Sequence, residues 1–167
     1  MSTKSAGKTG MTHEIIEVRR MRKGYSNRLW FDNMPIEQVK LNPKSRDRMV
    51  SVLRVLQQAY VDRELADRIL GLVAADIDDN TQTDNERSVM DCWHIVVLAA
   101  VWLRCMLTYD RLQDLAENHR NLRAIMGLGD GDEMEFNERT ICDNLSLLKP
   151  ETIAEIRHLI AGEGHQI

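Results

Sequence analysis

The sequence predicts an all-α fold, a multi-helix bundle that follows an extended basic N-terminal arm. Three observations predict it. From Ser45 onward, apolar residues recur at the spacing of amphipathic helices, and no run of alternating residues indicates paired strands. Helix-capping residues stand before several of these stretches. The chain of 167 residues, 43% hydrophobic and 29% charged, is long enough to bury an apolar core.

Residues 1–44 are expected to form the flexible or extended basic arm. Residues 1–12 are rich in Ser, Thr, Gly and Lys and have no apolar period. Pro35 and Pro43 disfavour helix in the residues that precede them. The stretch from Pro35 to Leu41 alternates weakly, so it fits either a short strand or a segment wrapped on the domain.

The helical domain is expected to span residues 45–167 and to begin with a helical hairpin over residues 45–78. Each helix of the hairpin has one apolar face, and Asp62 is a suitable N-cap for the second. The two faces consist of Met49, Val52, Leu53, Leu56 and Tyr60, and of Leu65, Ile69, Leu72, Val73 and Ile77. Residues 79–88 are polar and mostly acidic, which predicts an exposed loop.

Residues 89–167 are expected to form a bundle that resembles a helix-turn-helix. Ser88 can cap a helix that runs to about Leu107. This helix is apolar on all sides between Ile95 and Leu103, so it should be the buried central helix.

Four shorter helices should follow the central one. Thr108 can cap the first of them, and Gly127 can end the second. Asn137 can cap the third, and Pro150 suits the first position of the last.

The net charge of −4 conceals a separation of charge along the chain. Residues 1–60 hold 12 Lys and Arg against 5 Asp and Glu, a net charge of +7, whereas residues 61–167 carry −11. A basic front (residues 1–60) followed by an acidic body (residues 61–167) is typical of a protein whose N-terminal arm contacts nucleic acid. Basic termini are also common as solvated segments. The cations of the arm that we expect to contact DNA are Arg19, Arg20, Arg22, Lys23 and Arg28.

The third of the short helices has a polar face opposite its apolar stripe. That face carries Arg139, Thr140, Asp143 and Ser146, with Asn144 at its flank. Side chains of these types reach phosphate oxygens or base edges, and Arg139, Thr140 and Asn144 are the candidates for base reading. The alternative is a plain helical bundle with a polar outer face.

No constellation in the sequence predicts catalysis, a metal or a cofactor. Cys92 and His94 point in different directions on a helix, so they cannot chelate one zinc ion. His94 is better explained as a core or interface histidine with a satisfied nitrogen. Three cysteines cannot form a disulfide framework, which favours a reducing cytoplasm. No uncharged run is long enough to span a membrane, and no small-molecule substrate is evident.

Five motifs, in order, resemble the N-terminal region of bacterial insertion-sequence transposases of the ISNCY type, from about residue 34 to the C-terminus. They are Asn42-Pro43-Lys44-Ser45-Arg46-Asp47; Asp91-Cys92-Trp93-His94-Ile95-Val96-Val97-Leu98; Tyr109-Asp110-Arg111-Leu112 with Leu115-Ala116 and His119; Leu122-Arg123 before Gly127; and Asp143-Asn144-Leu145-Ser146-Leu147-Leu148 followed by Pro150-Glu151.

The resemblance implies a DNA-binding module that recognises the terminal inverted repeats of a transposable element. In such transposases a downstream ribonuclease-H-like domain carries three acidic metal ligands and cuts the DNA. The resemblance implies that this catalytic domain would begin about where the sequence ends, so we expect no cleavage by this chain alone. It also implies double-stranded DNA as the partner. The alternatives are an inactive remnant, or a helical dimerisation module whose Trp93 and Trp102 lie at an interface.

Overall fold

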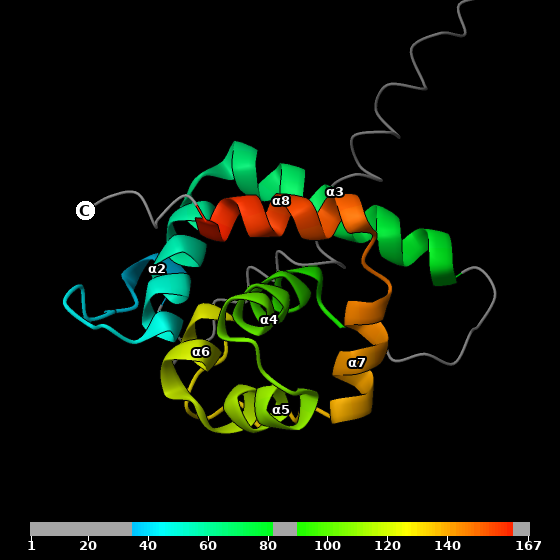
Figure 1. Cartoon of the computed structure of the whole chain (residues 1–167). Coiled ribbons are helices and arrows are strands. Elements are labelled where there is room, and N and C mark those ends of the chain that lie inside the picture. Colours follow the sequence, from blue (N-terminus) through cyan, green and yellow to red (C-terminus); the bar gives the residue numbers. More distant parts are fainter. Residues whose placement is uncertain (1–34, 82–89, 162–167) are drawn as a thin grey trace, which may run out of the picture.

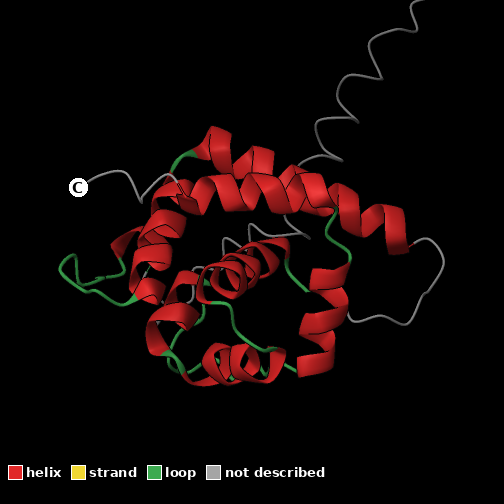
Figure 2. Ribbon diagram, viewed as in Figure 1, coloured by secondary structure: helices red, strands yellow, loops and turns green. Residues whose placement is uncertain are grey.

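The computed structural model describes residues 35–81 and 90–161, and within these ranges the chain forms helices and no strands (Figure 2). The predicted all-α class is therefore confirmed. The elements are the 3-10 turn η1 (Ile36–Gln38) and the α-helices α2 (Arg48–Val61), α3 (Arg63–Thr81), α4 (Cys92–Cys105), α5 (Tyr109–Asn118), α6 (Arg120–Ile125), α7 (Glu138–Ser146) and α8 (Pro150–Ala161).

Helix α4 is the centre of the bundle, as its uniformly apolar sequence predicts. All ten residues from Cys92 to Val101 are buried. Helices α2, α3, α5, α7 and α8 all contact α4, and α3 and α8 lie together along one side of it (Figure 1). Such a helix is stable only when neighbours cover its whole surface, so α4 fixes how the shorter helices are arranged.

The helix caps follow the sequence with two exceptions. Thr108 stands at the N-cap position of α5, but its side chain accepts no capping hydrogen bond. Asp62 and Asn137 accept backbone hydrogen bonds at the starts of α3 and α7, as expected. Ser88 is not the cap of α4. The helix begins at Cys92, and the carboxylate of Asp91 accepts the backbone N–H of Trp93 at 2.9 Å. Ser88 lies outside the described residues.

The boundary of the predicted acidic loop was also wrong. Helix α3 continues through Thr81, so residues 79–81 are helical. Asp79 pairs with Lys149 of the segment before α8, at 2.6 Å between Oδ2 and Nζ. This contact and the packing of α8 on α3 outweigh the low helix propensity of Asp and Asn at the end of α3.

Residues 35–47 wrap around α2 and do not form a strand. Ile36 and Val39 are buried in the core. The amide Nε2 of Gln57 donates hydrogen bonds to the carbonyl oxygens of both, at 2.9 and 2.8 Å. Of the two expectations for this stretch, the wrapped segment is correct, and the packed domain begins before the predicted boundary at residue 44.

Candidate nucleic-acid interface

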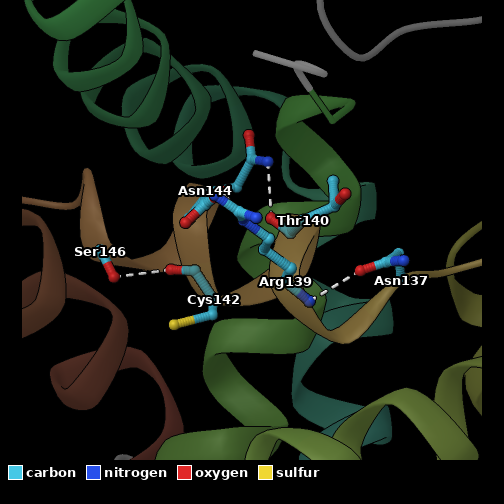
Figure 3. Close-up of polar contacts among 7 residues, drawn as sticks. Asn137, Arg139, Thr140, Cys142, Asn144 and Ser146 are labelled. Atoms are coloured by element: carbon cyan, nitrogen blue, oxygen red, sulfur yellow. Dashed lines mark hydrogen bonds and ion pairs between the residues drawn. The ribbon is translucent and has the colours of Figure 1, made fainter.

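Helix α7 carries the side chains that the sequence proposes for base reading. The side chain of Asn137 starts the helix by accepting the backbone N–H of Arg139 at 2.9 Å (Figure 3). Ile141 and Leu145 are buried, and α7 contacts both α4 and α5. These contacts leave the side of the helix that carries Glu138 and Arg139 in solvent.

Arg139 is the most accessible of the three candidates on α7. Its side chain is 90% exposed, and its Nε lies 3.9 Å from the carboxylate of Asp143, one turn later. An exposed ion pair at this distance contributes little and exchanges readily for another anion. Thr140, by contrast, is only partly exposed. Arg139 is therefore available to DNA, but it has a carboxylate beside it.

Asn144, expected at the flank of the outer face and available for base reading, is buried instead. The residue is only 4% exposed. Its Oδ1 accepts the backbone N–H of Met90 at 3.2 Å, and its Nδ2 donates to the carbonyl of Thr140 at 2.8 Å, the second of which Figure 3 shows. Asn144 follows Ile141 by three residues, so helical spacing places it in the apolar stripe. Its side chain joins α7 to the residues that precede α4.

A pocket of about 460 Å³ lies beside α7 and reaches Thr140. Asp91, Glu117 and Glu135 contribute to its lining, which contains no Lys or Arg. Three carboxylates repel phosphate, so this side of α7 is unfavourable for a DNA backbone. The sequence did not predict the pocket, because its walls come from separate segments that only the fold brings together.

Besides Arg139, four of the nine described Lys and Arg side chains beyond α2 have carboxylate partners. The pairs are Arg68–Glu155, Arg111–Asp114, Arg120–Asp130 and Lys149–Asp79, with N···O distances between 2.6 and 3.3 Å. The hydrogen bond from Lys149 to Asp79 raises the pKa of the lysine ammonium, which stays charged and paired. Binding phosphate at these positions would require an ion pair to be exchanged. Arg104 and Arg157, by contrast, are exposed and make no hydrogen bond or ion pair with the described residues.

The five cations of the basic arm lie outside the described residues. They are Arg19, Arg20, Arg22, Lys23 and Arg28.

The helix-turn-helix-like interpretation also stays a prediction. Helices α5 and α6 are joined by His119 alone, whereas residues 126–137 separate α6 from α7.

Two residues of one of the motifs that carry the transposase resemblance, Trp93 and His94, join α4 to the end of α6. Trp93 Nε1 donates to the carbonyl of Ile125 at 2.8 Å, and His94 Nε2 lies 2.9 Å from the carbonyl of Met126. A carbonyl only accepts, so Nε2 of His94 carries the hydrogen. Both side chains are buried, which confirms His94 as a core histidine with one satisfied nitrogen. These motif residues hold α4 to the end of α6.

The two tryptophans named for a dimer interface have partners within the chain. Trp93 is a buried core residue whose ring lies 5.0 Å from that of Tyr60. Trp102 is partly exposed and stacks on Tyr109, with ring centroids 5.5 Å apart and planes 16° from parallel. Neither ring therefore needs a second subunit to explain its position, and the homodimer stays a prediction.

No protein-family model matches this chain, and neither a curated protein nor a solved structure matches it. Among residues 35–81 and 90–161, no helix combines the length and the apolar character that crossing a membrane requires. Over the same residues, no three His, Cys, Asp or Glu side chains are grouped so that they could hold a metal ion.

Proposed function

We propose that this chain is the DNA-binding portion of a transposase, which recognises the terminal inverted repeats of its element and does not cleave DNA by itself. The observation that carries the proposal is the separation of charge, +7 over residues 1–60 against −11 over residues 61–167. DNA carries one negative charge per about 1.7 Å of its axis, so a basic front directs a duplex to one side of an otherwise acidic protein.

The paired cations of the body support this assignment. Arg68, Arg111, Arg120 and Lys149 pair with carboxylates of the same chain, so phosphate could bind at these four positions only by exchange of an ion pair. The motif series adds the transposase context, because it is the recognition part of such enzymes that the sequence resembles. A cytoplasmic location fits both genomic DNA as the partner and three free cysteines.

The proposed contacts follow the sequence with one change. Arg19, Arg20, Arg22, Lys23 and Arg28 contact phosphates or a minor groove. Arg139 and Thr140 remain candidates for base reading. Asn144 is not among the proposed contacts, because its side-chain amide is buried and hydrogen-bonded.

Fluorescence anisotropy tests the proposal directly. The full chain is titrated into labelled duplexes that carry the inverted repeats flanking its own coding sequence, and into scrambled duplexes of equal length and composition. We expect binding to both, with tighter binding to the repeats. Equal affinity for the two duplexes would contradict the recognition of element ends. Absence of binding to either duplex would contradict the DNA-binding function altogether. Sedimentation of the same sample, with and without duplex, tests whether two copies pair on DNA.

A further inference from the structure

Cations without carboxylate partners gather near the N-terminal end of the described chain. Lys40, Lys44, Arg46 and Arg48 are all exposed. None of the four side chains makes a hydrogen bond or ion pair with the residues that the structure describes. This segment therefore differs from the body of the protein, where five of the nine described arginine and lysine side chains beyond α2 form ion pairs with carboxylates.

The backbone of this segment is held firmly against α2. Arg54 donates from Nη1 to the carbonyl of Pro43 at 3.1 Å. Asn42 Oδ1 accepts the backbone N–H of Lys44 at 3.0 Å, and Ser45 Oγ accepts that of Asp47 at 3.2 Å. These bonds fix the path of the chain, so the cationic side chains project from an ordered surface.

The one carboxylate between residues 40 and 54 is already in use. Asp47 caps α2, where its Oδ1 accepts the backbone N–H of Met49 at 2.9 Å. Its negative charge therefore lies at the positive end of the α2 dipole. Asp47 forms no ion pair with the neighbouring Arg46 or Arg48.

The end of α4 adds a fifth cation to this region. Helices α2 and α4 contact each other, and Arg104 in the last turn of α4 is exposed. Arg48, Arg104 and Asp47 all act electrostatically on the partly exposed thiol of Cys105, so the three lie within electrostatic range of that side chain. Burial raises the pKa of that thiol, and the two arginines lower it in part. We call Lys40, Lys44, Arg46, Arg48 and Arg104 the front surface.

We propose that the front surface, and not helix α7, is where the folded domain contacts the phosphates of duplex DNA. This inference rests on the proposed function and names the part of the domain that performs it. The five cations of this surface have no ion pair with the described residues, so each can neutralise a phosphate without exchanging a partner among them. Helix α7 offers a single cation, Arg139, which is paired with Asp143 and lies near an acid-lined pocket. Four of the five cations of the front surface also lie in residues 1–60, the part of the chain with a net charge of +7.

Two native thiols allow the inference to be tested on the unmodified protein. Cys105 lies at the front surface and Cys142 lies on α7, and both are partly exposed, whereas Cys92 is buried. The chain is treated with a small alkylating reagent, with and without a saturating scrambled duplex, and each cysteine peptide is quantified by mass spectrometry over time. We expect the duplex to slow alkylation of Cys105 several-fold and to leave that of Cys142 unchanged.

Every other pattern of protection contradicts the inference. Protection of Cys142 alone would place the duplex on α7. Protection of neither thiol, by a duplex that anisotropy shows to be bound, would leave the arm as the sole contact and would overturn the front surface while the proposed function stands. Failure of the duplex to bind at all would overturn both.

A pair of matched variants provides an independent test. Lys44→Gln/Arg46→Gln/Arg48→Gln removes three unpaired cations, and Arg68→Gln/Arg111→Gln/Arg120→Gln removes three paired ones with the same change in net charge. If the front surface contacts phosphates, the first variant makes the logarithmic salt slope of binding shallower by about 3, whereas the second changes it by less than about 1. Circular dichroism checks that both variants fold. Equal effects would show that only net charge matters and would overturn the inference.

Discussion

Asp76 on α3 and Thr152 on α8 share a buried hydrogen bond, 2.6 Å from Thr152 Oγ1 to the Asp76 carboxylate. The same carboxylate oxygen accepts the backbone N–H of Lys149 at 2.9 Å. A carboxylate from one helix thus caps the first turn of another, and the negative charge lies at the positive end of the α8 dipole.

Replacing Asp76 should destabilise the protein more than any exposed acid on α3. We expect Asp76→Ala to lower the free energy of unfolding by about 2–3 kcal/mol, because it leaves the hydroxyl of Thr152 and the N–H of Lys149 without an acceptor. Asp79→Ala, one turn later, removes only the exposed pair with Lys149 and should cost less than about 1 kcal/mol. Urea denaturation measures both values, and equal losses would contradict the capping role.

Asn144 should behave as a structural residue. We expect Asn144→Ala to lower stability by about 1–3 kcal/mol, because the N–H of Met90 and the carbonyl of Thr140 lose a partner in a partly buried setting. Under conditions where the variant is folded, its preference among duplex sequences should match that of the unmodified chain. Arg139→Ala is the control, with little change in stability. A stable Asn144→Ala protein with altered base preference would restore the original prediction.

Met106 provides a substitution that should increase stability. It ends α4 in the left-handed region, at φ 52°, and 85% of its surface is exposed. Glycine adopts this conformation without the steric cost that other residues incur, so Met106→Gly should stabilise the fold by about 0.5–1 kcal/mol after its larger loss of backbone entropy. Met106→Ala retains the steric cost and should not stabilise. Thermal denaturation of the three proteins distinguishes the two effects.

Alkaline pH should weaken the fold through two tyrosines. Burial raises the pKa of Tyr60 and of Tyr109 above the ordinary value of 10.0. A raised pKa in the folded state means that the associated stability is fully present below pH 10.0 and is lost as the pH rises through the folded pKa. Denaturation midpoints measured across this range should fall less in a Tyr60→Phe/Tyr109→Phe variant than in the unmodified chain. An identical fall of the midpoint in both proteins would show that titratable groups other than these two tyrosines cause the loss of stability.

The arrangement around α4 could be predicted because its sequence leaves few choices. A helix that is apolar on all sides must be buried, and the structure buries Cys92 through Val101. The caps at Asp62 and Asn137 are equally local, since each depends on a side chain beside its own helix. The start of α4 was misplaced because Ser88 and Asp91 are both good caps, and the intervening residues do not distinguish them.

The features that were missed depend on contacts between distant segments. The final turn of α3 is fixed by Lys149, and residues 35–41 are fixed by Gln57. Asn144 was misassigned because its polar side chain was given more weight than its spacing from Ile141. At Lys44 and Arg46, sequence alone could not show that these cations are unpaired while others of equal exposure are neutralised.

The dependence of duplex binding on salt tests the central claim most directly. If the basic front neutralises about seven phosphates, the logarithm of the association constant for the full chain should fall with the logarithm of the salt concentration at a slope of about −6. Fluorescence anisotropy on a short labelled duplex provides this slope. A value near zero, or no binding at low salt, would show that the positive charge of residues 1–60 does not serve to hold DNA.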